Sequence, residues 1–468
     1  MKKLGFLIFL LACGCQSFRE QPAVPASADT QPHIFLLDTA LFSSADLNSL
    51  ASVRAFYARK DFALFWHDGG TLIAAADSLT DMLRDAKAFG LIDRDYHVKE
   101  LETVLKDTVS ADRFSKADVL LSDAYLTLYS HIRDGRLDPQ TLMRRDLSRI
   151  TDQAAIASLE ILGSASIKKE LQLIEPPAPQ YHLLKAALKL LPISEPLDSV
   201  QGDKAVKIGL NMERWRWQAQ WPDRYVVVNI PAFIMRVVEK DSLYLESKVI
   251  VGKRETPTPV LESVIRSFII YPYWHAPRSI STKEILPELQ ADAAYLHRNN
   301  FEVLNKRGTV IDPDTIQWRL YSRDHFPYVL RQREGSENSM GIIKFNFANN
   351  YGVYLHDTNS RRLFGRSKRD LSHGCVRVHK AVGLAHYLVR EDDVYVSPED
   401  LDQYLSLQQR LKIDLRKPIT LKLEYFTAEV RNAVPLFYDD IYKKDSVMIR
   451  SLYQAYDTLL PPANGTSL

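Results

Sequence analysis

The chain has 468 residues, of which 46% are hydrophobic, 10% aromatic and 25% charged. This composition is that of a globular protein with a sizeable core, and it excludes disordered, collagen-like and disulfide-dense proteins. The length predicts two or three domains. Because 60 Lys and Arg face 58 Asp and Glu, a formal net charge of +2, the overall charge gives no reason to expect nucleic-acid binding. Local sites must carry the function.

The N-terminus predicts export. Residues 1–15 contain two lysines, an apolar run over 4–12 and small residues before a cysteine. The run is shorter than the roughly 20 residues that span a bilayer, but it fits a secretory signal peptide. Leu-Leu-Ala-Cys at 10–13 resembles a bacterial lipobox, so we expect a lipoprotein-type signal with Cys13, or less favourably Cys15, lipidated. The alternative is a cleaved signal without lipid. With the lipid attached, the protein is expected to be periplasmic and anchored to a membrane, either the inner or the outer one.

The third cysteine, Cys375, stands alone. If cleavage precedes Cys13, Cys375 has no thiol partner deep in the exported chain, so it cannot form an intramolecular structural disulfide there. A lone thiol in an oxidising compartment is a hazard, and its presence therefore suggests a use.

The first half of the chain is predicted to be helical. Residues 16–45 are polar and rich in Pro, Ala and Ser at the start, as in a linker. Apolar residues then recur at helical spacing up to a glycine or a proline, which favours an α-helical scaffold over 46–204. Three helices are expected from this pattern: around Leu79–Ala86 ending at Gly90, over Leu121–Ile132 ending at Gly135, and over Tyr181–Leu191 ending at Pro192.

The second half is predicted to be β-rich. Short β-branched and aromatic runs separated by turn residues indicate a domain over 205–440, with helices near 282–290 and 380–390. Residues 276–345 are polar and irregular, with a turn at Asp312-Pro313-Asp314, and such an excursion favours a functional lid. Residues 441–468 are expected to be a C-terminal tail. The expected strands cover Tyr225–Ile230, Arg236–Val238, Lys248–Val251, Arg266–Tyr271, Gly352–Leu355 and Ile419–Val430.

The stretch YLHDTNSRRLFGRSKRDLSHGCVRVHKA, residues 354–381, carries the chemistry. If the segment after Gly374 is extended, Cys375 and Arg377 project to one face, and alternation likewise places Tyr354 and His356 together. A cysteine needs a nearby base or positive charge to react as thiolate near neutral pH. His356 and His373 are the candidates for that role.

Other interpretations of this stretch are weaker. Cys375 alone is compatible with a small buried hydrophobe. A zinc site is disfavoured, because the spacing of the cysteine and the nearby histidines matches no familiar ligand pattern and the chain has no Cys-x-x-Cys or HExxH. The basic residues between the two halves of the site are compatible with a solvated loop or with substrate carboxylates. The histidines weighed as ligands are His373, His379 and His386, and the basic residues are Arg361, Arg362, Arg366, Lys368 and Arg369.

His-Asp-Thr at 356–358 and Ser-His-Gly-Cys-Val-Arg-Val at 372–378 together resemble the active-site signature of L,D-transpeptidases with a YkuD-type catalytic domain. In that family a histidine precedes the cysteine motif by under twenty residues, and here Cys375 follows His356 by 19. The flanks are similar to the large subclass with an N-terminal helical scaffold. They are NMERWRW (211–217), VVVNIPAF (226–233), VGKRETPTPV (251–260), YPYWHAPRSISTKEILPEL (271–289), KFNFANNYGVYLHDT (344–358), YFTAEV (425–430) and YDDIY (438–442).

One departure from that subclass concerns its peptidoglycan-binding module. The subclass usually inserts a small helical module before the NMERWRW segment. Here only Pro192–Ile208 separates the third expected helix from that segment, and no such module is recognisable.

The resemblance implies an α+β multidomain protein, in which an α-helical scaffold precedes a β-rich catalytic domain with a capping lid. It also implies the substrates and the reaction. Cys375 attacks a tetrapeptide stem of peptidoglycan, D-alanine leaves, and the side-chain amine of a diamino acid in a neighbouring stem resolves the thioester to give a 3–3 cross-link. Carbapenem-type inhibitors are expected to react with the cysteine. No metal or organic cofactor is needed.

The resemblance assigns roles to particular residues. His356 is the expected general base, and His373 lines the site. The N–H groups of Gly374 and Cys375 meet the oxyanion of the tetrahedral intermediate, and Arg377 holds a substrate carboxylate. Tyr354, Ser372 and Asp357 complete the expected substrate site, Asp357 at most as an orienter of His356 through its backbone carbonyl.

Two alternatives stay open. The same acyl-enzyme resolved by water gives an L,D-carboxypeptidase or cross-link hydrolase. The other is a catalytically silent wall-binding lipoprotein.

Overall fold

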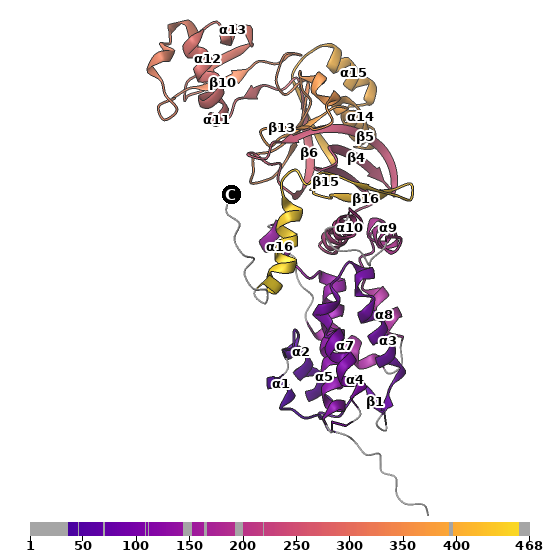
Figure 1. Cartoon of the computed structure of the whole chain (residues 1–468). Helices are drawn as coiled ribbons and strands as arrows, with labels where there is room; N and C mark the ends of the chain where they lie inside the picture. The colour runs from indigo at the N-terminus through magenta and orange to yellow at the C-terminus, as the bar shows by residue number, and fades with distance from the viewer. Residues whose placement is uncertain are drawn as a thin grey trace, which may run out of the picture.

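The computed structural model describes residues 36–44, 46–68, 71–107, 109–110, 112–143, 152–162, 166–191, 200–218, 220–392 and 396–457. Figure 1 shows three parts in a row: a helical region, a sheet region above it and a smaller subdomain that projects to one side. The predicted signal peptide with Cys13 and Cys15 lies outside the described residues. Within them, no helix combines the length and the apolar character needed to cross a membrane.

The N-terminal region is a helical bundle around one long helix, α5 (Arg113–Asp134), which is buried along most of its length. The predicted helix before Gly90 is α3 (Ala74–Arg84), continued by a 3-10 turn that Gly90 ends at φ 67°. The second part of the predicted linker is not free, because Leu37 and Phe42 are buried in the core of this bundle. The other helices are α1 (Leu41–Ser44), α2 (Leu50–Ala58), α4 (Val98–Lys106), α6 (Pro139–Met143), α7 (Asp152–Ile161) and α8 (Ile167–Leu173), and the strands β1 (His67–Asp68) and β2 (Thr71–Leu72) form a short hairpin.

Two helices, α9 (Pro179–Lys189) and α10 (Val200–Arg216), lie between the bundle and the sheet region (Figure 1). The sequence predicted α9 and missed α10. The reason is that α10 has no single apolar stripe. Ile208 and Met212 are buried with α9, whereas Leu210, two positions from each of them, is buried with the sheet. Because α10 packs against one core on each side, its apolar residues do not recur at the spacing of a single helical face.

The sheet region is built on nine strands in the order β13-β5-β14-β12-β11-β6-β15-β3-β4, and an additional pairing of β4 with β5 closes it on itself. Closure leaves few strand edges exposed. Its inward side chains form the largest apolar core, which α14 (Ala381–Asp392) and α15 (Pro398–Ser406) help to cover. The strands are β3 (Arg224–Asn229), β4 (Ile234–Glu239), β5 (Ser242–Gly252), β6 (Leu261–Ile270), β11 (Ile343–Phe347), β12 (Leu355–His356), β13 (Asp370–Ser372), β14 (Val376–Val378) and β15 (Leu411–Glu424).

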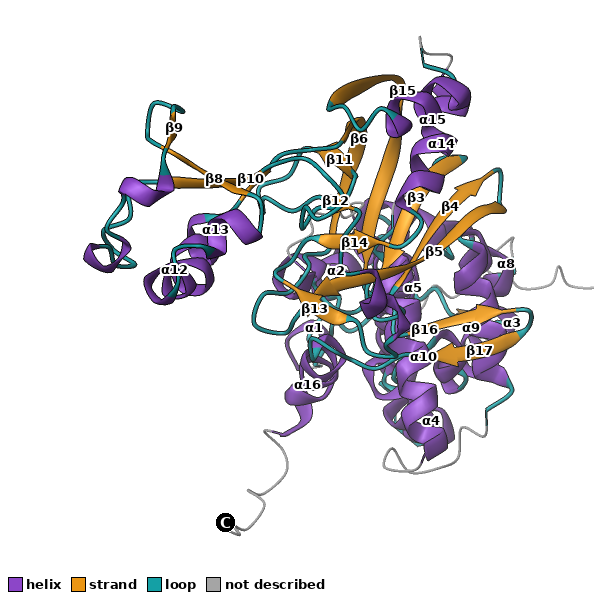
Figure 2. Ribbon diagram, turned by 90° about the horizontal axis from the view of Figure 1, so that it is seen from above, coloured by secondary structure: helices purple, strands orange, loops and turns teal. Residues whose placement is uncertain are grey.

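The predicted lid is a subdomain with its own core rather than an irregular excursion. It has a four-stranded sheet in the order β7-β10-β8-β9, and Figure 2 shows it projecting from the large sheet. The predicted turn is a 3-10 turn at Pro313–Thr315 with Asp312 as its cap. The subdomain comprises β7 (Trp274–His275), α11 (Arg278–Ile280), the π-turn η3 (Ser281–Ile285), α12 (Leu286–Ala291), α13 (Tyr295–Arg298), β8 (Phe301–Leu304), β9 (Val310–Ile311) and β10 (Val329–Gln332).

The chain after β15 is structured. The strands β16 (Ala428–Arg431) and β17 (Val434–Phe437) form a hairpin, and α16 (Lys444–Asp457) follows in the part expected to be a tail. Tyr425 and Met448 are buried in the core of the large sheet, so this segment packs as part of the sheet region.

Candidate functional site

Two neighbouring parallel strands assemble the predicted site. In β12 and β14, Leu355 pairs with Val376 and His356 with Arg377. Leu355 and Val376 are buried in the core, so alternation turns Tyr354, His356, Cys375 and Arg377 to the other face. The structure thus brings together the two pairs that alternation grouped separately, Tyr354 with His356 and Cys375 with Arg377.

The Cys375 thiol is free and partly buried beside Tyr354. Burial raises the pKa of the thiol above the usual 9.0. The Tyr354 side chain and the positive charges of Lys344 and Arg377 lower the pKa by a smaller amount. The sulfur is therefore protonated at neutral pH, and its attack on a carbonyl requires a base.

His356 fits that requirement. The side chain is buried, and burial, followed by the charge of Arg377, lowers its pKa to about 3. The imidazole is neutral at pH 7 and able to accept a proton. Among the described residues, nothing hydrogen-bonds the buried Nδ1.

Lys344 completes the charged surroundings and was not predicted. It lies opposite His356 in the pairing of β11 with β12, and its Nζ lies 4.4 Å from the centroid of the Tyr354 ring. Burial lowers the pKa of its ammonium, and the Cys375 sulfur acts against that shift. The alternation in Lys-Phe-Asn-Phe at 344–347 was the available signal, but only the pairing with β12 places Lys344 at the site.

Ser372 shapes the turn before the cysteine. Its hydroxyl donates to the Cys375 carbonyl at 2.6 Å and accepts from the Gly374 N–H at 3.1 Å. Ser372 is buried, and its hydroxyl is satisfied within the loop. The Gly374 N–H is occupied by that hydroxyl. The Cys375 N–H has no hydrogen-bond partner within the described ranges, so of the two expected oxyanion donors it is the one free to bind a ligand.

His373 faces the lid. Its Nε2 lies 2.7 Å from Oε1 of Glu284, which belongs to the π-turn η3 of the projecting subdomain. The Trp274 side chain, at the root of the same subdomain, also acts on Tyr354, because it lowers the pKa of that hydroxyl against the rise caused by burial. His373 is thus paired with a lid carboxylate at the rim of the site.

Asp357 and the basic run are mainly structural. The buried Asp357 carboxylate accepts from Arg361 at 2.7 Å and from the Ile342 N–H at 3.1 Å, so both contacts tie it to neighbouring segments of the chain. Arg369 is also buried and donates to the carbonyls of Val249 and Phe233, both at 3.1 Å. The exposed members of the run are Arg361, Arg362, Arg366 and Lys368.

Arg377 is the cation available to a ligand. It is half-buried, and its Nε is buried without a hydrogen-bond partner in the part of the chain that the structure describes. Burial lowers its guanidinium pKa, with the Cys375 sulfur and Tyr354 acting against the shift. A buried guanidinium without a carboxylate suits bidentate binding of one from a ligand. The described residues contain no group of three or more His, Cys, Asp or Glu able to hold a metal ion.

Comparisons with known proteins give two family matches. Residues 51–188 match a family described as a scaffold domain, and residues 223–396 match the L,D-transpeptidase catalytic domain, YkuD. A Haemophilus influenzae protein named "Putative L,D-transpeptidase" is 30% identical over 331 residues, which cover 70% of this chain and 66% of that relative, just under two thirds of its length.

Solved structures of L,D-transpeptidases are also similar, at low overlap. The ertapenem-acylated catalytic domain of the E. faecium enzyme shares 13% identity over 44% of this chain and all of its own, with a TM-score of 0.20. The Mycobacterium smegmatis enzyme shares 12% identity over 43% of this chain and 58% of its own, with a TM-score of 0.19.

The pKa of Cys375 predicts how its alkylation depends on pH. Since burial holds the thiol pKa above 9.0, thiolate accumulates only above that value, and the alkylation rate is expected to keep rising past pH 9. Iodoacetamide labelling followed by mass spectrometry of the Cys375 peptide measures the rate, with Cys375→Ala as the unlabelled control. A plateau between pH 6 and 8 would show that a thiolate already exists at neutral pH.

Proposed function

Because this chain belongs, through its YkuD-type catalytic domain, to the L,D-transpeptidase family, we propose that it is a peptidoglycan L,D-transpeptidase that forms 3–3 cross-links through a Cys375 thioester. The observation that carries the proposal is the face shared by a protonated thiol, a buried neutral imidazole and a guanidinium without a carboxylate partner in the described residues. Those are a nucleophile, its base and a binding group for an anionic peptide.

In the first half-reaction, the Cys375 sulfur attacks the carbonyl between the L-centre of the diamino acid and the terminal D-alanine of a tetrapeptide stem. His356 takes the thiol proton, and the oxyanion of the tetrahedral intermediate accepts a hydrogen bond from the Cys375 N–H. The C–N bond then breaks, the proton passes to the departing amine, and D-alanine leaves with the stem held as a thioester.

In the second half-reaction, the side-chain amine of a neighbouring stem attacks the thioester carbonyl. A base accepts the amine proton, the C–S bond breaks and the sulfur recovers a proton, so the enzyme returns to its starting state. Arg377 is proposed to hold a stem carboxylate, since its guanidinium has no carboxylate partner among the described residues. The Tyr354 hydroxyl lowers the thiol pKa against the rise caused by burial, and so favours the thiolate.

We also propose that the protein is exported and anchored by a lipid on Cys13. The support is the order of lysines, apolar residues and small residues within 1–15.

The products distinguish transfer from hydrolysis. The full chain incubated with purified tetrapeptide-stem muropeptides is expected to give dimers with one D-alanine lost per dimer, identified by mass. Cys375→Ala is expected to give none while unfolding at the wild-type temperature, and a carbapenem is expected to add its mass to Cys375 only in the wild type. Tripeptides alone would make the protein a hydrolase, no product from the wild type would favour a silent wall-binding protein, and cross-linking by Cys375→Ala would refute the cysteine mechanism.

His356 and His373 are expected to differ in their effect on turnover. Loss of a general base costs on the order of 10²–10⁴ in rate, so His356→Ala should lower kcat by at least that much. His373, which pairs with Glu284 in the lid, should show a milder loss in His373→Ala. Steady-state rates of the two variants test this, and the opposite ranking would exchange their roles.

Arg377 and Arg362 are expected to differ in their dependence on salt. Losing one partner of a buried charged pair costs about 2–5 kcal/mol, whereas a rim charge changes mainly the association rate. Arg377→Ala should therefore lower kcat/KM at every ionic strength. Because Arg362 is exposed, Arg362→Ala should lower kcat/KM only at low salt, where screening is weak. Rates of both variants at two salt concentrations provide the measurement, and equal, salt-independent losses would place Arg362 in the binding pocket.

A further inference from the structure

We infer that Tyr442, which lies beyond the matched catalytic domain, is a positioning residue for the nucleophile loop, acting through Thr258 on the peptide group between Gly374 and Cys375. This inference rests on the proposed function. Tyr442 comes from the segment between β17 and α16, which the sequence analysis placed in a tail.

The Tyr442 hydroxyl binds the loop that follows β5. It donates to the Gly252 carbonyl at 2.5 Å and accepts from the Thr258 N–H at 3.1 Å. These bonds join segments that are 190 and 184 residues apart. One hydroxyl therefore holds both ends of the 252–258 loop.

Thr258 carries the connection to the nucleophile loop. Its buried hydroxyl donates to the Gly374 carbonyl at 2.7 Å and accepts from the Gly252 N–H at 2.9 Å. The backbone N–H of Thr258 binds Tyr442. Thr258 thus fixes Gly374 from a position that Tyr442 sets.

The peptide plane turns this contact into an effect on catalysis. The Gly374 carbonyl and the Cys375 N–H belong to one planar peptide group. A hydrogen bond that fixes the direction of the carbonyl also fixes the direction of the N–H, which is the donor left for the oxyanion. Gly374 has φ 116° and no side chain, so its own backbone preference restrains this plane weakly. Within the loop, Ser372 binds the Gly374 N–H and the Cys375 carbonyl on either side of this peptide group, and the group itself is held by the Thr258 bond from outside.

Close packing leaves little room for an alternative position. A Cβ built on Gly252 would lie 3.0 Å from the Gly374 Cα and 2.1 Å from the Thr256 carbonyl oxygen. The missing side chain of Gly252 therefore lets the two loops touch along their backbones. A small shift of the 252–258 loop transfers directly to Gly374.

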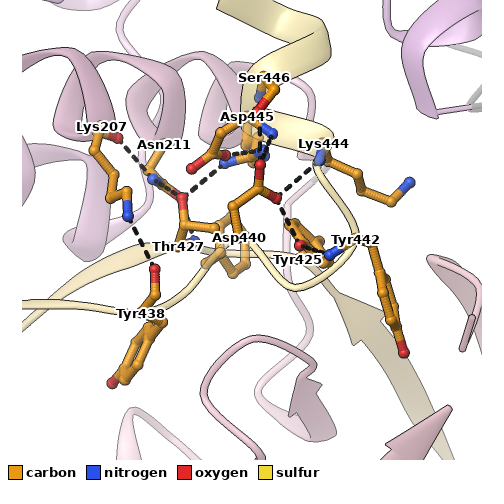
Figure 3. Close-up of polar contacts among 12 residues, drawn as sticks. Lys207, Asn211, Tyr425, Thr427, Tyr438, Asp440, Tyr442, Lys444, Asp445 and Ser446 are labelled. Carbon is orange, nitrogen blue, oxygen red and sulfur yellow. Dashed lines mark hydrogen bonds and ion pairs between the residues drawn. The ribbon is translucent and has the colours of Figure 1, made fainter. Parts of the chain in front are cut away.

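Tyr442 is itself fixed by a polar network (Figure 3). Its N–H donates to the Tyr425 hydroxyl at 2.8 Å, and that hydroxyl donates to Asp440 at 2.7 Å. The Asp440 carboxylate also accepts the first backbone N–H groups of α16, and Asp445 pairs with Arg214 of α10 at 2.6 Å. The Tyr425 and Tyr442 rings are stacked, with their centroids 5.6 Å apart. The segment is thus anchored to the junction helix before it reaches the site.

Hydroxyl deletions test the inference in the full chain. Tyr442→Phe keeps the stacked ring, and Thr258→Val keeps the volume of the side chain. Both are expected to lower kcat by roughly 10- to 100-fold with KM little changed, since misplacing a reacting group or its donor costs in this range. Thr258→Ser retains the hydroxyl and is expected to retain activity.

Tyr438→Phe is the matched control. The Tyr438 hydroxyl, in the same segment, binds Glu429 at 2.5 Å and lies outside the connection to Gly374. Thermal unfolding of all variants measures any general loss of stability. If Tyr442 only stabilises the fold, Tyr442→Phe and Tyr438→Phe will lower the unfolding temperature while kcat stays at the wild-type value, and the inference is then wrong.

Alkylation of Cys375 separates this inference from the proposed function, because it needs no peptidoglycan. Tyr442→Phe and Thr258→Val are expected to change the rate or pH profile of iodoacetamide labelling at Cys375, whereas Tyr438→Phe is not. If the wild type forms no cross-links but the labelling changes as expected, the function fails and the positioning role stands. If the wild type cross-links while Tyr442→Phe leaves both kcat and labelling unchanged, the positioning role fails and the function stands.

Discussion

The burial of three charged side chains on α10 constrains the rest of the structure. Glu213 and Arg216 pair at 2.9 Å, and Glu213 also accepts from the Leu137 N–H of the helical bundle at 2.7 Å. Arg214 pairs with Asp445 of the C-terminal helix at 2.6 Å. Removing one partner of a buried ion pair leaves the other charge buried without a partner, which lowers the free energy of unfolding by about 3–5 kcal/mol. Bundle, junction helix and C-terminal segment are therefore held in one arrangement, and the sheet region packs on it.

At the site, burial and the neighbouring positive charges shift the pKa of the Cys375 thiol in opposite directions. Burial keeps both Cys375 and His356 neutral before reaction. Lys344 and Arg377 favour a thiolate once it forms, but they disfavour an imidazolium beside them. A proton on His356 is therefore held weakly. That suits a residue that must give the proton up to a departing amine within the same half-reaction. The two cations therefore favour the thiolate and the release of the proton, and they oppose proton uptake by His356.

The sequence predicted the part of the site that lies on one face of two short strands. Alternation alone grouped Tyr354 with His356 and Cys375 with Arg377. Lys344 was missed because its place depends on which strand pairs with β12, and register is a tertiary property. Tyr442 was missed for the same reason at longer range, since its partner Gly252 is 190 residues away. The helix α10 was missed because two cores share its faces.

The two histidines of the motif divide their work between chemistry and the lid. His356 is buried between cations and has a neutral ring, whereas 38% of the His373 side chain is exposed and its Nε2 meets the lid residue Glu284. The lid has a hydrophobic core of its own, so its shape does not depend on the sheet region. Its Glu284 pairs with His373, two residues before Cys375. The lid therefore meets the motif at the more exposed histidine, whereas the Thr258 bond to Gly374 holds the peptide plane of the nucleophile from the sheet region.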